Sequence, residues 1–186
     1  MRIVGGQYKG RAIAAPPGRD TRPTSDRARE SLFNILAHAD WSPGIEGRRV
    51  LDLFAGSGAL GFEAISRGAT FALFVETDSA ARGAIRDNIE TLGLFGTTRI
   101  HRRDATDLGV KPAGLGDPFD LVFLDPPYGK GLGERAMAAL GEGGWITPQA
   151  VIMLEVGADE APSLPAFEIL DEREYGAAKI LFLKLR

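Results

Sequence analysis

Residues 50–61, VLDLFAGSGALG, decide how this chain is expected to fold. An apolar run leads into the glycine pattern Gly56-x-Gly58-x-x-Gly61, and helix-forming residues follow it. Glycines at this spacing allow a tight turn and let a ligand approach the backbone closely. Glu76 follows 20 residues after Gly56, at the end of the next apolar run, where an acidic residue can hold two ribose hydroxyls. The stretch therefore predicts a strand, a loop and a helix that together bind a nucleoside-containing cofactor, rather than a turn needed only for packing.

The rest of the chain alternates between short apolar runs and helical periodicity. Strands are expected at residues 49–54, 70–76, 98–101, 119–124 and 150–156, and helices at residues 59–67, 79–92 and 133–140. Two further β-rich segments, residues 167–172 and 179–185, have no helical pattern between them and are expected to pair antiparallel. Strands that alternate with helices are typical of an α/β protein with a parallel, doubly wound sheet. A late antiparallel hairpin completes the predicted sheet.

The first 40 residues differ from this pattern and predict an N-terminal extension. Short β-prone pieces at residues 2–4 and 11–14 flank glycines and predict a small hairpin. A helix is expected to begin near Thr24 or Ser25, with Asp26 in its first turn. Its core-facing stripe is formed by Ala28, Leu32, Ile35, Leu36 and Ala39, whereas Arg27 and Arg29 fall away from it. We therefore expect a hairpin-and-helix extension over residues 1–40 and a cofactor-binding domain over residues 41–186.

Composition and charge narrow the functional classes. The 186 residues are 44% apolar and 25% charged and include no cysteine, which excludes a disulfide framework and a thiolate nucleophile. The two histidines lack a second ligand at metal-binding spacing, so no metal site is expected. No signal peptide or membrane span is apparent, which predicts a soluble cytoplasmic protein. Residues 1–30 carry a net charge of +4 and the remaining chain −7, so a basic arm is expected to contact a polyanion.

Asp52 indicates which cofactor the glycine loop binds. A dinucleotide site directs a helix N-terminus at an anionic pyrophosphate, and a carboxylate beside the glycines would repel that group. S-adenosylmethionine instead carries an ammonium and a sulfonium and has no phosphate. Asp52 therefore favours S-adenosylmethionine over NAD, although the same carboxylate could simply cap the helix or brace the loop.

Carboxylates close four of the expected core strands: Asp52, Glu76, Asp104 and Asp125. In open α/β sheets, ligands bind along this edge. Asp104 could accept the amino group of an adenine, with the backbone amide of Ala105 on a ring nitrogen. A simple cap of the following turn is the alternative for Asp104.

Asp125-Pro126-Pro127-Tyr128 follows the apolar run FDLVFL of residues 119–124. Two prolines force the chain out of the sheet. The exit offers the Asp125 carboxylate, the Pro126 carbonyl and the Tyr128 ring. Two acceptors beside an aromatic ring suit a flat group with an exocyclic NH2, because the acceptors take its two protons and the ring stacks on its face. A plain Pro-Pro turn after a core strand is the alternative.

Several of these motifs together resemble the RsmD-type bacterial methyltransferases. The resemblance spans MRIVGGQYKGR, RPTSDRARESLFNIL, VLDLFAGSGALGFEAISRGA and VFLDPPY. The FAGSGALG and DPPY elements are shared with other amino-group methyltransferases, whereas RPTSDRARE is more specific. The resemblance implies a Rossmann-like class I fold, with a seven-stranded, mostly parallel sheet whose last strand is antiparallel. It also implies methylation of the exocyclic N2 of a guanine in 16S rRNA, at position 966 in the family.

The resemblance also implies roles for individual residues. Asp125, Pro126, Pro127 and Tyr128 would hold the target guanine. The residues expected to bind S-adenosylmethionine are Asp52, Phe54, Ala55, Gly56, Ser57, Gly58, Glu76, Asp104, Ala105, Arg22 and Thr24. Those expected to contact RNA phosphates are Arg2, Lys9, Arg11, Arg19 and Arg22, although scattered surface charge would explain each one singly.

The expected partner is 16S rRNA or an assembling small ribosomal subunit, bound by a monomer without metal or membrane. Three alternatives stay open. The same Asp-Pro-Pro-Tyr site could methylate the N6 of adenine in DNA or the side-chain amide of glutamine in a protein. A module that binds NAD or RNA without catalysis is the third.

Overall fold

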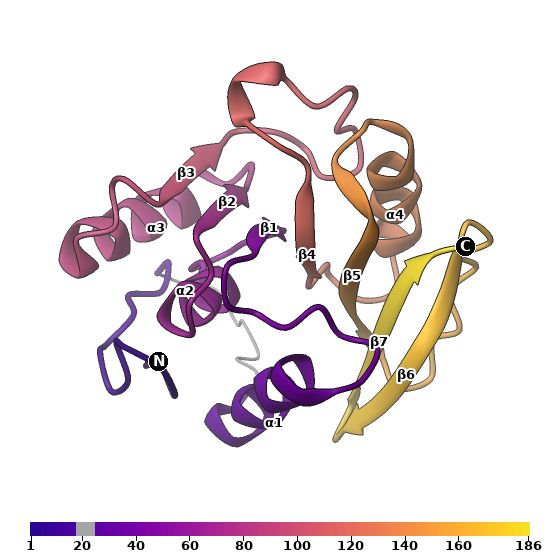
Figure 1. The fold of residues 1–186 in the computed structure, drawn as a ribbon, viewed down its shortest axis with the longest axis horizontal. Coiled ribbons are helices and arrows are strands. Elements are labelled where there is room, and N and C mark those ends of the chain that lie inside the picture. Colours follow the sequence, from indigo (N-terminus) through magenta and orange to yellow (C-terminus); the bar gives the residue numbers. More distant parts are fainter. Residues whose placement is uncertain (18–24) are drawn as a thin grey trace.

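The computed structural model describes residues 1–17 and 25–186 (Figure 1). The helices of these residues are α1 (Asp26–His38), α2 (Ala59–Ser66), α3 (Ser79–Leu92) and α4 (Leu132–Glu142), with a 3-10 turn η1 (Ala113–Leu115). The strands are β1 (Arg49–Leu53), β2 (Phe71–Val75), β3 (Thr98–His101), β4 (Phe119–Leu124), β5 (Ile146–Gly157), β6 (Phe167–Tyr175) and β7 (Ala178–Leu185). Every strand and helix expected beyond residue 25 is present.

The seven strands form one sheet in the order β3-β2-β1-β4-β5-β7-β6. The first five of these pair in parallel, and β7 runs antiparallel to both β5 and β6. This confirms the predicted mostly parallel sheet with an antiparallel last strand. The chain moves from β1 outward to β3 and then returns to the other side of β1 at β4. The strand order therefore reverses between β1 and β4, the position where open α/β sheets bind ligands.

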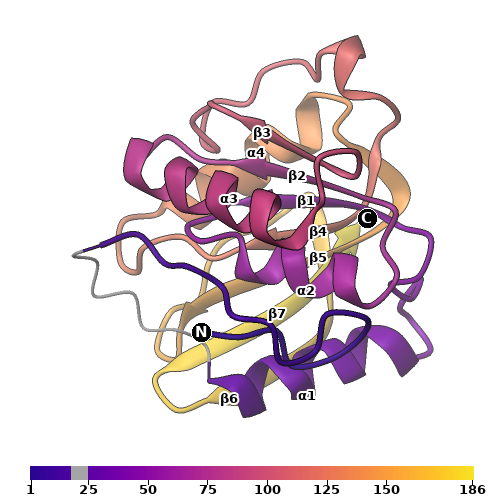
Figure 2. The same ribbon diagram turned by 90° about the vertical axis from the view of Figure 1, so that its left-hand side faces the viewer.

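Helices cover both faces of the sheet (Figures 1 and 2). Apolar side chains of α1, α2 and α3 pack with those of one sheet face into a single core cluster. Helix α4 and the η1 turn pack with the opposite face into a second cluster. Because the central strands are covered on both sides, their side chains are buried in both directions, which explains why FALFV is a continuous apolar run and FDLVFL is interrupted only by the half-buried Asp120.

Residues 1–17, here called the N-terminal arm, form a turned segment beside α1 and α2 (Figure 2). Its predicted hairpin is present as a short antiparallel pairing through one bridge, Arg2 with Ala12. Ile3 and Ile13 are buried in the same core cluster as α1 and the sheet. The arm therefore packs on the sheet domain, and the proposed division near residue 40 stays a prediction.

Helix α1 begins where the sequence predicts, because the Ser25 hydroxyl accepts the Ala28 N–H at 3.1 Å. The expectation for Arg29 is wrong: its side chain is 1% exposed and lies on the buried face of α1 with Leu32, Phe33 and Leu36. Its Nε donates to Oε1 of Glu63 on α2 at 3.2 Å. Glu63 is itself fully buried, and a buried carboxylate requires a partner cation.

Strand β5 begins at Ile146 rather than at residue 150. Ile146 pairs with Phe119, and the register between the two strands shifts before Leu121. Pro148, which has no N–H for a ladder bond, lies in this irregular stretch. Residues 146–149 are half-buried or exposed, so they do not show the apolar pattern of a buried strand.

Candidate active site

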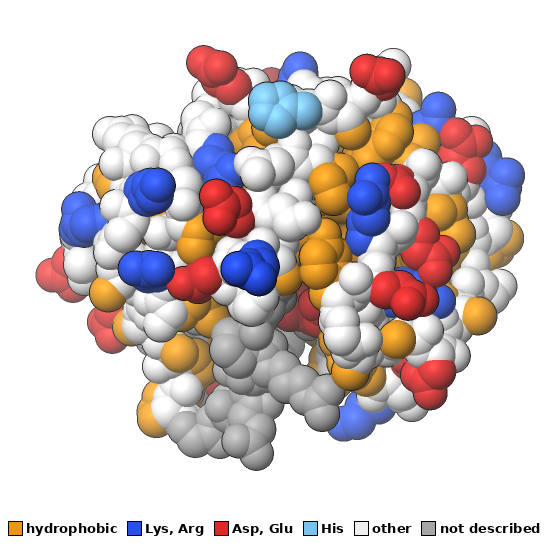
Figure 3. Space-filling model, turned by 90° about the horizontal axis from the view of Figure 1, so that it is seen from below, with side chains coloured by type: hydrophobic (Ala, Val, Ile, Leu, Met, Phe, Trp, Pro, Cys, Tyr) orange, Lys and Arg blue, Asp and Glu red, His pale blue; other side chains and the backbone are white. Residues whose placement is uncertain are grey.

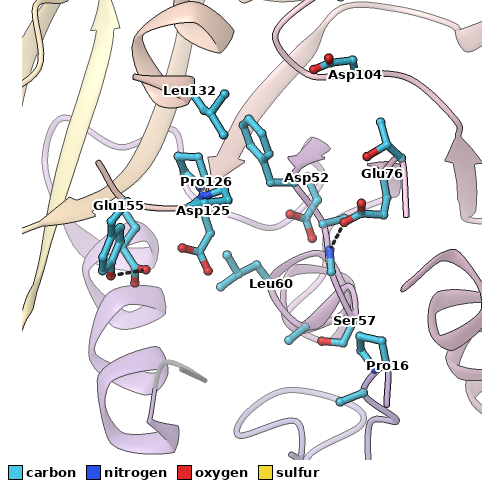
Figure 4. A pocket seen from close by; sticks show the side chains of 18 of the residues that line it. Pro16, Asp52, Ser57, Leu60, Glu76, Asp104, Asp125, Pro126, Leu132 and Glu155 are labelled. Carbon is cyan, nitrogen blue, oxygen red and sulfur yellow. Dashed lines mark hydrogen bonds between the residues drawn. The ribbon is translucent and has the colours of Figure 1, made fainter. Parts of the chain in front are cut away.

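A cavity of about 840 Å³ lies along the carboxyl ends of the central strands. Figure 4 shows carboxylates at the ends of β1, β2 and β4 and within β5, with Asp104 above them in the view. These carboxylates belong to Asp52, Glu76, Asp125 and Glu155. The predicted site residues that line the cavity are Asp52, Phe54, Ala55, Gly56, Ser57, Glu76, Asp104, Asp125, Pro126, Pro127 and Tyr128. The structure thus brings together the predicted cofactor loop and the Asp-Pro-Pro-Tyr turn. Gly58 and Ala105 are buried next to this lining, and Arg22 and Thr24 lie outside the described residues.

The glycine loop joins β1 to α2 in a turn that needs its glycines for two different reasons. Phe54, Gly56 and Gly58 all have positive φ, which is unusual for Phe54 and ordinary for glycine. A Cβ at Gly56 would meet no atom within 4 Å, so the backbone there borders open space. By contrast, a Cβ at Gly61 would lie 2.4 Å from the Phe74 ring. Gly61 therefore lets α2 pack closely on β2, while Gly56 leaves room beside the loop.

Asp52 is the most enclosed carboxyl of the cavity, with 2% of its surface exposed. Its Oδ2 accepts the Gly61 N–H at 3.0 Å, so it braces the first turn of α2. Burial raises the pKa of Asp52 well above its ordinary value, the Gly61 hydrogen bond opposes this rise, and the charge of Glu76 adds to it. A positively charged ligand would stabilise the ionised carboxylate in this position.

Glu76 fastens the glycine loop to the end of β2. Its Oε1 accepts the Gly56 N–H at 2.8 Å, the bond drawn in Figure 4, and its Oε2 accepts the Asp78 N–H at 2.9 Å. Each carboxylate oxygen has a second lone pair, so Glu76 keeps capacity for ligand hydroxyls. Gly56 and Glu76, which are 20 residues apart in the sequence, are thus in direct contact.

Asp104 stands at the rim of the cavity and braces its own turn. Its Oδ1 accepts both the backbone N–H and the hydroxyl of Thr106, at 2.8 and 2.7 Å. These two bonds hold the pKa of Asp104 below its ordinary value, with help from the charge of Arg135 on α4. Both Thr106 and Arg135 line the cavity, and neither was predicted. The turn-bracing alternative for Asp104 is therefore observed, and its carboxylate still borders the cavity.

Asp125 leaves β4 directly into the cavity, and Tyr128 follows two residues after Pro126. The Asp125 side chain is open to the cavity but enclosed by its walls. This enclosure raises the pKa of Asp125 well above its ordinary value, as do a hydrogen bond with Glu155 and the charges of Glu155 and Asp52. The Tyr128 hydroxyl donates to Oε2 of Glu155 at 2.8 Å. The turn is therefore held by a side chain of the neighbouring strand.

Glu155 is a cavity residue that sequence reasoning missed. Leu124 pairs with Leu154 in the parallel β4–β5 ladder, so Asp125, just after β4, and Glu155, within β5, lie at the same level. The signal was available, since a carboxylate near the end of the fifth core strand follows the rule that singled out the other four. Its partnership with Tyr128 depends on the strand order and was not readable from the sequence.

The N-terminal arm forms one wall of the cavity through Met1, Ala15 and Pro16. Asn88 of α3 holds this wall in place. Its Oδ1 accepts the Ala14 N–H at 2.8 Å, and its Nδ2 donates to the Ala14 carbonyl at 3.0 Å and the Ser57 carbonyl at 3.1 Å. One buried amide thus joins the arm to the glycine loop.

The described basic residues of the arm lie at the surface. Arg2 pairs with Asp26 at 3.1 Å, Arg11 donates to the Thr91 carbonyl at 2.9 Å, and Lys9 is exposed. Seen from below, Lys and Arg side chains lie among Asp and Glu side chains, with apolar side chains between them (Figure 3). Arg19 and Arg22 lie outside the described residues. Arg2, Lys9 and Arg11 are thus exposed at the surface.

The fold recurs in solved structures. The protein described as putative methyltransferase yhhF from Escherichia coli matches 100% of this chain and 98% of its own, with a TM-score of 0.83 and 36% identity. A putative methylase of Haemophilus influenzae, HI0767, matches 99% of this chain and 97% of its own, with a TM-score of 0.80 and 33% identity. The fold and the site define a Rossmann-like class I methyltransferase.

The family described as conserved hypothetical protein 95 matches residues 1–184, and the chain belongs to this family, the RsmD-type methyltransferases. Ribosomal RNA small subunit methyltransferase D of Escherichia coli K12 is 40% identical over 167 residues, which cover 89% of this chain and 80% of that protein. The putative rRNA methyltransferase YlbH of Bacillus subtilis is 34% identical over the full length of both.

Residues 1–17 and 25–186 include no helix long and apolar enough to cross a membrane. The same residues hold no group of three or more His, Cys, Asp or Glu side chains arranged to bind a metal ion.

Proposed function

We propose that this enzyme transfers a methyl group from S-adenosylmethionine to the exocyclic N2 of a guanine in 16S rRNA. One observation carries the proposal: Asp52 and Asp125 face a single cavity from the adjacent strands β1 and β4. The glycine loop lies beside Asp52, and the Pro-Pro-Tyr turn lies beside Asp125. A cofactor half and a substrate half thus share one crevice. The rRNA methyltransferases named above, at 40 and 34% identity, support the RNA substrate.

The residues of the cofactor half fit S-adenosylmethionine. Repulsion between Asp52 and Glu76 contributes to the raised pKa of Asp52, and a cationic ligand would relieve it, whereas a pyrophosphate would worsen it. Asp52 and the loop from Phe54 to Gly58 would hold the methionine part, Glu76 the ribose, and Asp104 with the Ala105 amide the adenine. Arg22 and Thr24 are proposed to close over this ligand. When bound, S-adenosylmethionine supplies a methyl group activated by the sulfonium charge.

The residues of the substrate half would position the target amine. Its lone pair is delocalised into the purine and is a poor nucleophile. Hydrogen bonds from its two protons to Asp125 and the Pro126 carbonyl would orient the nitrogen and raise its electron density. Positioning of two reactants in this way can lower a barrier by about 7–11 kcal/mol in favourable cases. The Asp125 carboxylate would also stabilise the cationic product before its proton leaves.

The arm would bind the RNA around the target. In an RNA helix the N2 of guanine lies in the minor groove, so the base must be unstacked or lie in a loop to enter the cavity. Arg2, Lys9 and Arg11, with Arg19 and Arg22, would contact phosphates, which position the RNA without reading its sequence. An enzyme with this substrate would act in the cytoplasm during ribosome assembly, and we propose that it acts as a monomer.

The test is to incubate the protein with methyl-labelled S-adenosylmethionine and unmodified 16S rRNA or small-subunit particles. Digestion to nucleosides should give labelled N2-methylguanosine. Asp125→Ala should abolish labelling while cofactor binding is kept, and Glu168→Ala on β6, far from the cavity, should change neither. Label in adenine or in a protein amide would identify the alternative substrates. Tight cofactor binding without label in any RNA would contradict the proposal.

A further inference from the structure

Two carboxyl groups of the substrate half meet where sequence reasoning expected one. Asp125 follows the end of β4, Glu155 lies at the same level within the neighbouring parallel strand β5, and both line the cavity. The neighbouring Glu155 carboxyl helps to raise the pKa of Asp125, and Figure 4 shows both carboxyl groups directed to the same side of the cavity. Two carboxylates in contact repel unless a proton, a cation or a donor lies between them. The pair therefore favours a ligand that presents adjacent hydrogen-bond donors.

The edges of the possible substrates differ in this respect. Guanine carries an N1–H donor next to its N2 amine, so two neighbouring nitrogens donate. Adenine and cytosine each carry an amine next to a ring nitrogen that accepts. A glutamine side chain carries an amine next to a carbonyl, which also accepts. The guanine edge is complementary to two neighbouring carboxylates, because both of its nitrogens donate. Adenine, cytosine and a glutamine side chain would each place a lone pair against the second carboxylate.

We propose that Glu155 is the residue that selects guanine, by accepting its N1–H while Asp125 and the Pro126 carbonyl hold the N2 amine. This inference rests on the proposed function and adds the group that reads the base. The contact relieves the repulsion between the two carboxylates only for a base with adjacent donors. A site of this kind discriminates against an analogue that lacks the donor, because the analogue places a ring lone pair against the Glu155 carboxylate.

Tyr128 links the Glu155 carboxylate to the aromatic ring on which the base would stack. Its hydroxyl donates to Oε2 of Glu155 at 2.8 Å, so the ring and the carboxylate are fixed relative to each other. A base stacked on the ring therefore meets the carboxylate at a set position along its edge. Glu155 thus acts on the substrate directly and on the ring through one hydrogen bond.

The test uses a base that keeps the reacting amine but lacks the N1–H. In 2-aminopurine the N2 amine is present and N1 is an acceptor. Two synthetic RNAs spanning the mapped target, one with guanine and one with 2-aminopurine at that nucleotide, are compared by kcat/KM for methyl transfer. The wild-type protein should prefer guanine roughly tenfold to hundredfold. Glu155→Gln should lower guanine methylation and narrow this preference to within about threefold, because an amide can donate to N1 as well as accept.

A second variant separates base reading from positioning of the ring. Tyr128→Phe removes the bond to Glu155 but leaves the carboxylate, so it should slow both RNAs by a similar factor and keep the preference. Thermal unfolding of both variants checks that they fold. Equal use of the two RNAs by the wild-type protein overturns the inference, as does an equal loss on both RNAs in Glu155→Gln. Failure to methylate guanine at all would instead count against the proposed function.

Discussion

Arg29 and Glu63 form a buried ion pair that ties α1 to α2, with Arg29 Nε 3.2 Å from Glu63 Oε1. Their side chains are 1% and 0% exposed. Glu63 also accepts the Val4 and Gly5 N–H groups of the arm, each at 3.0 Å, and pairs with Arg67 at 3.0 Å. One carboxylate thus joins the arm, α1 and the helix that follows the glycine loop.

Loss of one partner of this pair should destabilise the protein strongly. Arg29→Met leaves the Glu63 carboxylate with less compensation in the core, which typically costs about 3–5 kcal/mol. Urea unfolding should show this loss in the free energy of unfolding. The matched control is Arg2→Ala, because its pair with Asp26 is exposed and should contribute less than about 1 kcal/mol. Similar stability of the two variants would show that the buried pair is not a structural tie.

Asp52→Asn should weaken binding of S-adenosylmethionine and change the pH dependence of stability. A hydrogen bond to a charged group contributes about 1.5–3 kcal/mol, so the dissociation constant should rise roughly tenfold to hundredfold in calorimetry. An NAD site would instead keep or improve its affinity for NAD in this variant.

The pH effect follows from the raised pKa of Asp52. The folded protein binds the Asp52 proton more tightly than the unfolded chain does. Protonated Asp52 therefore contributes its full stabilisation below the pKa of the unfolded chain, near 3.8, and this stabilisation is lost as the pH rises through the pKa of the folded protein. Asp52→Asn removes this loss. The difference in free energy of unfolding, variant minus wild type, should therefore increase from pH 4 toward neutrality. A difference that stays flat or falls would contradict the assignment.

Gly61→Ala should destabilise the junction between α2 and β2. The new Cβ would lie 2.4 Å from the Phe74 ring and 3.2 Å from Asp52 Oδ2, and overpacking of this kind costs about 1–3 kcal/mol. Gly83→Ala in α3 is the control, since its Cβ would meet nothing within 4 Å. Alanine there should stabilise the helix by about 0.5–1 kcal/mol. Thermal unfolding should give a lower midpoint for Gly61→Ala than for Gly83→Ala. Equal midpoints would contradict the close packing assigned to Gly61.

Asn88→Ala should loosen the arm from the glycine loop. The change leaves the Ala14 N–H and the Ser57 carbonyl without their partner, which should cost about 1–3 kcal/mol. Limited proteolysis should then cleave within the arm faster than in the wild-type protein. Ser31→Ala removes one side-chain bond, to Tyr175, away from the cavity, and should leave the arm protected. Equal protection of the arm in both variants would show that Asn88 does not hold it.

The sequence determined the order and the type of the elements and most of the cavity lining. Continuous apolar runs identified the covered parallel strands, and the glycine spacing identified the turn after β1. Parallel strands bring their carboxyl ends to one edge of the sheet, so Asp52, Glu76, Asp104 and Asp125 could be placed together before any contact was known. These are local patterns combined with one topological rule.

The tertiary structure decided which side chains meet. The sequence pattern places Arg29 away from the apolar stripe of α1, yet it lies on the buried face, and only the packing of α1 on α2 gives it a buried partner 34 residues away. Glu155 was readable as a strand-end carboxylate, but its contacts with Asp125 and Tyr128 follow from β5 lying next to β4. Hydrophobic periodicity predicts whether a position is buried, but it does not predict which residue buries it. The polar partners that come from distant elements are therefore determined only when the helices and strands pack together.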